Sequence, residues 1–200
     1  MSDDILVYDI EDRRYINLSS SCTLKCQFCP KTQGHPTVHQ YDLTLHEKKN
    51  VEDYTRAIGD PTKYTEIVFC GFGEPTLRFK ELLAISHWIK ENGGMVRVNT
   101  DGLANLVYKR NVLPEMGKCV DALSISMNAQ NEEIYNKHCQ PSLAGSYQAM
   151  LDFIEEAPKY ISDVTASAID GLEGVDIEAC EKLANERHVK FRRRVLNNVG

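Results

Sequence analysis

Three cysteines within eight residues constrain this chain more than any other feature of its sequence. Cys22, Cys26 and Cys29 follow the β-prone run 14–18 at x3 and x2 spacing. Because closing such short loops costs little entropy, the three thiolates can gather around one metal ion or cluster. A structural zinc site takes four ligands, and an iron–sulfur cubane ordinarily takes four cysteines. Three protein ligands leave one coordination position open, and an open position on a metal indicates chemistry.

The alternative is a zinc site in which Cys70 or His35 supplies the fourth ligand. Neither residue lies at zinc-finger spacing from the triplet, and zinc would leave the glycine-rich turn at 71–75 unexplained. The remaining cysteines belong to no second cluster motif, so we expect no additional iron–sulfur centre. They are Cys70, Cys119, Cys139 and Cys180.

Composition and charge are those of an ordinary globular protein. The 200 residues are 42% apolar and 26% charged, and the net charge of −6 gives no sign of a broad nucleic-acid surface. The acidic start and the absence of a long apolar run predict a cytoplasmic protein without signal peptide or membrane span. Seven cysteines in a reducing cytosol are not a disulfide framework. No linker divides the chain, so we expect one domain over 1–200, with 1–13 as an N-terminal hairpin extension.

Strand-like and helix-like segments alternate along the chain. The β-prone runs 4–9 and 14–18 predict a hairpin, and a polar loop should extend from the cysteines to Gln40. Thr44-Leu45-His46-Glu47 predicts a capping box that opens a helix ending at Gly59. The later strands are expected at 65–70, 95–99, 122–127, 164–169 and 188–195, and the later helices at 79–91, 103–116, 131–138, 144–157 and from Asp176 onward.

The two faces of these strands differ in polarity, and this predicts a barrel. Leu123 and Ile125 share one face of strand 122–127, whereas Ser124 and Ser126 share the other. A doubly wound sheet, covered on both faces, would have nearly continuous apolar strands. An apolar face and a small polar face instead fit outer helices and a hydrated lumen that takes a ligand. About six βα units are fewer than the eight of a TIM barrel. We therefore predict an α/β fold, a partial (β/α)6 TIM-type barrel with a short N-terminal β-hairpin.

A glycine-rich turn, Gly71-Phe72-Gly73-Glu74-Pro75, follows strand 65–70. The cysteine triplet follows the strand before it, and ligands of parallel α/β folds gather at the C-terminal ends of strands. The two motifs should therefore lie at one edge of the sheet. Gly71 and Gly73 would let the backbone approach a ligand closely, and Pro75 fixes the turn.

Together the two motifs resemble those of the radical S-adenosylmethionine (radical SAM) superfamily, and the resemblance covers essentially the whole chain. The cluster motif of that family, with an aromatic residue before the last cysteine, matches 22–29 with Phe28 as the aromatic residue. Its Gly-Gly-Glu-Pro motif matches 72–75, except that Phe72 replaces the first glycine. The stretches 67–77, 98–105 and 124–129 look like the small radical SAM proteins associated with TatD, a metal-dependent hydrolase.

The resemblance implies two cofactors and a reaction. Cys22, Cys26 and Cys29 would hold a 4Fe–4S cluster, and the methionine amino and carboxylate groups of S-adenosylmethionine would chelate the fourth iron. Reductive cleavage would give methionine and a 5′-deoxyadenosyl radical that abstracts hydrogen from an unidentified substrate. An electron donor such as flavodoxin or ferredoxin and a TatD-type hydrolase are the implied partners.

The resemblance also implies which residues contact S-adenosylmethionine. The turn at 71–75 would accept hydrogen bonds from the methionine amino group, and Phe28 would pack near the adenine. The residues implied as contacts are Phe28, Phe72, Gly73, Glu74, Asn99, Thr100, Ser124, Ser126 and Asn128, of which Asn99 and Thr100 suit the ribose hydroxyls. A cation for the carboxylate is also expected, with Arg97, Arg192 and Arg194 as candidates.

Other interpretations stay open. A glycyl-radical activating enzyme would bind a protein partner, and an enzyme like the small deazaguanine synthases would turn over a metabolite. A non-catalytic iron–sulfur module would regulate a nuclease partner. Asn99 and Ser126 could be lumen residues that bond only to backbone or water, and the Arg192–Arg194 run could be a charged strand edge that opposes aggregation.

Overall fold

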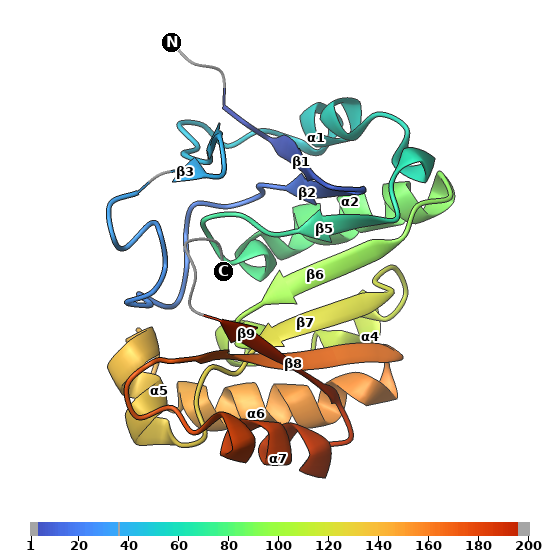
Figure 1. The fold of residues 1–200 in the computed structure, drawn as a ribbon. Helices are drawn as coiled ribbons and strands as arrows, with labels where there is room; N and C mark the ends of the chain where they lie inside the picture. Colours follow the sequence, from blue (N-terminus) through green and yellow to red (C-terminus); the bar gives the residue numbers. More distant parts are fainter. Residues whose placement is uncertain (1–3, 36, 196–200) are drawn as a thin grey trace.

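A central sheet of seven strands organises the protein, seen in a computed structural model that describes residues 4–35 and 37–195 (Figure 1). The strand order is β1-β2-β5-β6-β7-β8-β9. β1 pairs with β2 antiparallel, and every later neighbour pair is parallel. The strands are β1 (Val7–Ile10), β2 (Arg13–Ile16), β5 (Glu66–Phe69), β6 (Val96–Thr100), β7 (Ala122–Ser126), β8 (Asp163–Asp170) and β9 (Lys190–Val195).

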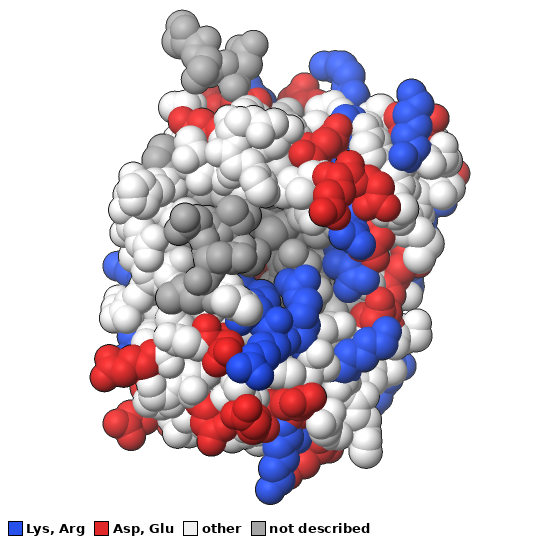
Figure 2. Space-filling model, viewed as in Figure 1, with Lys and Arg blue, Asp and Glu red and all other residues white. Residues whose placement is uncertain are grey.

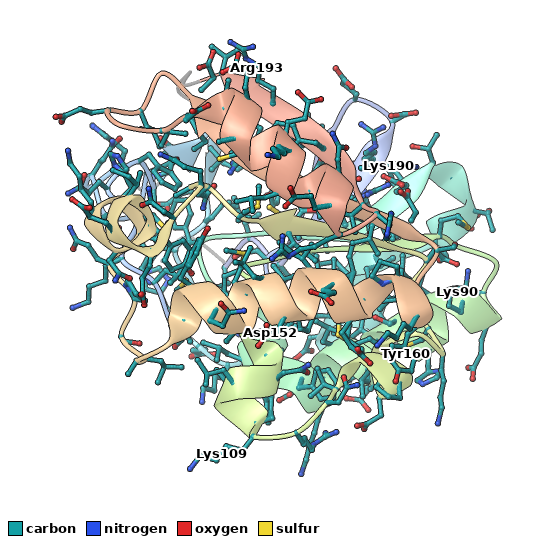
Figure 3. The ribbon with its side chains drawn as sticks, turned by 90° about the horizontal axis from the view of Figure 1, so that it is seen from below. Lys90, Lys109, Asp152, Tyr160, Lys190 and Arg193 are labelled. Carbon is teal, nitrogen blue, oxygen red and sulfur yellow. The ribbon has the colours of Figure 1, made fainter. Side chains whose placement is uncertain are left out.

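Helical connections carry the chain between the parallel strands, so strands that follow one another in sequence are neighbours in the sheet. The helices are α1 (Val51–Ile58), α2 (Phe79–Glu91), α3 (Ala104–Tyr108), α4 (Leu113–Met116), α5 (Glu132–Cys139), α6 (Ser146–Glu156) and α7 (Ile177–Glu186). Figure 3 shows α6 and α7 side by side, with Asp152 of α6 directed outward. The expected mixed α/β fold with a mostly parallel sheet is confirmed.

The two faces of the sheet differ as the alternation of residues predicted. Ile67, Val98, Leu123 and Ile125 are fully buried, in one cluster with apolar side chains of α2 and α6. The opposite, inner face carries polar side chains such as Ser124 and borders a cavity. Burial of apolar area on the helical side stabilises the sheet, whereas the inner face is left available for ligands.

The N-terminal hairpin is confirmed, with Val7 opposite Ile16, but the predicted capping box at Thr44–Glu47 is wrong. The backbone N–H groups of His46 and Glu47 donate to the Asp4 carboxylate (3.0 and 3.1 Å) instead of entering a helix. Helix α1 begins seven residues after Thr44, at Val51, and Asn50 caps it.

Two other segments differ in detail from the prediction. The loop expected through Gln40 contains a two-residue strand, β3 (Thr37–Val38), which pairs with β4 (Tyr41–Asp42). The single helical stretch expected at 103–116 is two short helices, because Lys109 adopts a left-handed conformation (φ 52°) that ends α3. None of the described helices has the length and apolar character needed to cross a membrane.

We expect Asn50→Ala to lower the free energy of unfolding by about 1 kcal/mol. Asn50 Oδ1 accepts from the Asp53 N–H (2.9 Å), and the Asp53 carboxylate accepts from the Asn50 N–H (3.2 Å), so the substitution removes a reciprocal cap. Glu47→Ala is the control, since it removes only an exposed pair with Lys49 and should change stability by less than about 0.5 kcal/mol. Urea unfolding measures both variants, and equal losses would contradict this assignment of the cap.

Candidate active site

The cysteine loop and the glycine-rich turn meet at the C-terminal ends of two paired strands, β2 and β5. The Glu74 N–H donates to the Ser21 carbonyl (2.8 Å), one residue before Cys22. A Cβ atom at Gly73 would clash with the carbonyl oxygens of Ser19 and Ser21. The glycine was expected to let the backbone approach a ligand, and in the structure it lets the turn lie against the backbone of the cysteine loop.

Gly71 and Phe72 attach the turn to the N-terminal hairpin. A Cβ atom at Gly71 would clash with the side-chain oxygen of Asn17, whose amide donates to Leu43 O (2.9 Å). The Phe72 ring is buried in a small cluster with Tyr8 and Leu43. The phenylalanine that replaces the first glycine of the family motif therefore packs the turn against residues 8 and 43.

Glu74 joins the turn to the end of β6 through a buried carboxylate, which is only 4% exposed. Its Oε1 accepts from Thr76 N, Thr76 Oγ1 and Thr100 Oγ1 (3.0, 2.6 and 2.8 Å), and its Oε2 accepts from Asp101 N (2.7 Å). Burial and the nearby charge of Asp101 raise the pKa of Glu74 to about 8, although the donors oppose this shift. The side chain thus positions Thr100 and Asp101.

Asp101 is a site residue that the sequence analysis missed. It is buried, it accepts from the Thr23 hydroxyl inside the cysteine loop, and its Oδ1 accepts from Leu103 N (2.9 Å). Burial raises the pKa of its carboxyl group. An acidic residue directly after Asn99 and Thr100, at the end of a parallel strand, was the signal that could have identified it.

Helix α5 supports the other side of the cysteine loop. The N–H groups of Lys25 and Gln27 donate to the carbonyls of Cys139 and His138 (3.0 and 2.9 Å), and Ser142 donates to Thr23 O (2.9 Å) from both its N–H and its hydroxyl. The last carbonyls of a helix lack partners within the helix, so they are available to hold a neighbouring loop. The loop is therefore fixed by β5, β6 and α5 through protein contacts alone.

The thiols of Cys22 and Cys26 lie in surroundings that disfavour free thiolates. Burial raises the pKa of Cys22 to about 12, with further contributions from the charges of Asp101, Glu74 and Cys29. A hydrogen bond with Cys139 and burial raise the pKa of Cys26. A bound cationic metal centre would reverse this balance, because a coordinating thiol is deprotonated by the metal's charge.

The described residues contain no arrangement of donors that could hold a single metal ion. Among residues 4–35 and 37–195, no three His, Cys, Asp or Glu side chains are placed to hold one metal ion, so the zinc alternative with Cys70 or His35 finds no support. The charges of Cys22 and Cys29 nevertheless contribute to the raised pKa of Cys26. In a 4Fe–4S cluster each cysteine binds a different iron, so its thiols need not converge on one point.

The remaining predicted contacts lie on the inner face or next to it. Asn99 and Ser124 line the cavity, and Asn99 Oδ1 is buried without a partner among the described residues. Ser126 is half-buried, and Phe28 is half-buried against the main core. Asn128 is buried, and its Oδ1 accepts from Arg194 Nη2 (2.7 Å).

The three candidate cations for the carboxylate differ in their partners and in their positions. Arg97 is paired with Glu66 and Asp163 (2.7 and 3.1 Å), and Arg192 lines the cavity. Arg194 interacts electrostatically with the thiols of Cys26 and Cys139, and its Nε is buried without a partner among the described residues. Arg194 is therefore the candidate placed beside the cysteine loop.

The Radical SAM superfamily profile matches residues 16–186, and the chain belongs to this superfamily. Its members use a 4Fe–4S cluster and S-adenosylmethionine, so the expected superfamily and cofactors are confirmed. Membership of the TatD-associated group stays a prediction.

Curated relatives and solved structures extend this comparison. The chain is 29% identical over 164 residues to the dual-specificity RNA methyltransferase RlmN of Wigglesworthia glossinidia brevipalpis, covering 76% of this chain and 40% of that protein. It is 23% identical over 184 residues to RlmN of Halorhodospira halophila, covering 87% and 49%. The chain thus spans less than half the length of these relatives.

Two solved structures share the fold. TYW1 with a lysine-pyruvate adduct bound has a TM-score of 0.65 at 14% identity, covering 92% of this chain and 64% of that one. Streptococcus suis SuiB bound to S-adenosylmethionine has a TM-score of 0.64 at 13% identity, covering 92% and 38%.

We expect Glu74→Gln to lower the free energy of unfolding by about 1–3 kcal/mol, because a buried amide cannot accept from all four donors around this side chain. Glu81→Gln is the control, since it weakens only a partly exposed pair with Arg78. Urea unfolding of the cluster-free protein separates the two variants. A Glu74→Gln variant as stable as the wild type would refute the positioning role.

Serine at Cys22, Cys26 or Cys29 should abolish the visible absorbance of the anaerobically reconstituted cluster. Cys119→Ser is the matched control, because Cys119 lies elsewhere in the core and a serine hydroxyl can still donate to the Glu115 carbonyl. Iron and sulfide content checks the absorbance. Any triplet variant that keeps the full cluster refutes the ligand assignment for that cysteine.

Proposed function

We propose that this chain is a radical SAM enzyme in which Cys22, Cys26 and Cys29 hold the 4Fe–4S cluster. The bound, reduced cluster would supply the electron that cleaves S-adenosylmethionine to methionine and a 5′-deoxyadenosyl radical for hydrogen abstraction. The observation that carries this proposal is the fixed position of the cysteine loop against the glycine-rich turn, through Glu74 N to Ser21 O and the tight packing at Gly73.

Unpartnered buried atoms support the proposed S-adenosylmethionine contacts. Asn99 Oδ1 requires a donor such as a ribose hydroxyl, and Arg194 Nε requires an acceptor such as a carboxylate. A bound partner would stabilise each group, since an unsatisfied buried polar atom costs about 1–3 kcal/mol. We therefore propose Arg194 as the carboxylate's cation. The remaining proposed contacts are Phe28, Phe72, Gly73, Glu74, Thr100, Ser124, Ser126 and Asn128.

We also propose that the parallel strands β2 and β5 to β9 form a partial (β/α)6 TIM-type barrel and that 1–200 is a single core domain. A cytoplasmic location is supported by seven free cysteines, which a reducing compartment maintains. Flavodoxin or ferredoxin would supply the electron, and a TatD-type hydrolase is the proposed partner.

The RNA methyl transfer named for the RlmN relatives is not part of this proposal, because the chain aligns with less than half of each relative described above.

Reductive cleavage is the direct test. The anaerobically reconstituted protein, given dithionite and S-adenosylmethionine, should produce 5′-deoxyadenosine and methionine in equal amounts, as measured by chromatography. Cys22→Ser should produce neither, because the cluster is lost. An intact cluster that binds S-adenosylmethionine but yields no 5′-deoxyadenosine would favour the non-catalytic regulatory module instead.

A further inference from the structure

The inner face of the sheet contains a cavity of about 320 Å³, separate from the cysteine loop. This volume lies at the small end of the range for ligand pockets. The residues that line it belong to β2, β5, β6, β7, β8 and β9, and those used below are Arg13, Glu66, Arg97, Asn99, Asp163, Lys190 and Arg192.

A chain of ion pairs crosses this cavity near the N-terminal ends of the strands. Glu66 pairs with Arg13 and Arg97 (3.3 and 2.7 Å), and Asp163 pairs with Arg97 and Lys190 (3.1 and 2.9 Å). The five side chains come from five different strands. Each carboxylate is therefore shared between two cations, and neither is left to repel an anion.

The cavity has an excess of positive charge. Four cations and two carboxylates line it, which leaves two positive charges uncompensated by the cavity's own acids. The exposed side chain of Arg192 has no hydrogen bond or ion pair with any described residue, whereas the side chain of its neighbour Arg193 pairs with Asp170. Figure 2 shows Lys and Arg side chains gathered on the face where β8 and β9 lie.

Strand register places Arg192 closer than Lys190 to the C-terminal ends of the strands, where the cysteine loop lies. Lys190 is aligned with Thr165, and through it with Ser124 and Asn99. Arg192 lies one step further along, aligned with Ser167 and through it with Ser126. A group bound to Arg192 would thus lie next to the site where the 5′-deoxyadenosyl radical is proposed to form.

We propose that this cavity is the substrate site and that its substrate is a small anion whose carboxylate or phosphate group binds Arg192. The excess positive charge around Arg97 and Lys190 would strengthen the attraction, because the charges of a cleft act together on an approaching anion. The substrate assignment rests on the proposed radical SAM function, whereas the anion site can be tested without it.

Isothermal titration calorimetry on the reconstituted full chain, with S-adenosylmethionine saturating, tests the anion site. Inorganic phosphate and succinate are the probes, and the one that binds more tightly indicates which group is preferred. Arg192→Gln should weaken binding at least about tenfold, equivalent to about 1.4 kcal/mol. Arg193→Gln is the matched control, because it makes the same charge change at the adjacent residue, and it should leave binding unchanged.

Three results would overturn the proposal. The first is no saturable binding of either probe at about 10 mM, a concentration at which a site with a Kd of about 1 mM would be largely filled. The second is an equal loss of anion affinity in the Arg192→Gln and Arg193→Gln variants. The third is anion binding only when S-adenosylmethionine is absent, which would assign Arg192 to the cofactor. Measuring 5′-deoxyadenosine in the same samples keeps the hypotheses apart. Anion binding without cleavage would reject the enzyme function alone, and cleavage without anion binding would reject the anion site alone.

Discussion

The buried carboxylate of Glu74 is the interaction on which the candidate site depends. A buried carboxyl group is unfavourable unless hydrogen-bond donors surround it, and Glu74 has them in Thr76, Thr100 and the Asp101 N–H. Because those donors come from two segments, the carboxylate joins the turn after β5 to the end of β6. Asp101 then extends the connection to Thr23 in the cysteine loop. Protein contacts alone therefore position the cysteine loop.

The inner face of the sheet is divided between two kinds of chemistry. Its C-terminal end carries the cysteine loop with small polar groups such as Asn128, and its N-terminal half carries the ion pairs around Arg97. Neutral polar groups suit the proposed S-adenosylmethionine, whose charges would be met by the cluster iron and by one cation. Cations in excess suit an anion. The division follows from strand direction, since β2 and the strands β5 to β9 run parallel and present the same ends to the same edge.

Local patterns predicted helices well where nothing distant competed. Helix α2 runs from Phe79 to Glu91 as expected, because Leu82, Ile85 and Ile89 form an apolar stripe that the core buries. The start of α1 was wrong because Asp4, about forty residues earlier in the chain, accepts from the backbone of His46 and Glu47. A capping pattern in the sequence cannot reveal such a distant competitor.

The sequence alone determined the superfamily, the cysteine triplet, the turn after β5 and the polar inner face, because spacing and alternation are local properties of the chain. Only the tertiary structure decided how these parts are held and charged. It brought Asp101 to Thr23 and Arg194 to Asn128, and it directed Arg97 to Glu66 and Asp163. Those pairs join different segments of the chain, so they follow from strand register and from the need of buried charges for partners, which no single segment contains.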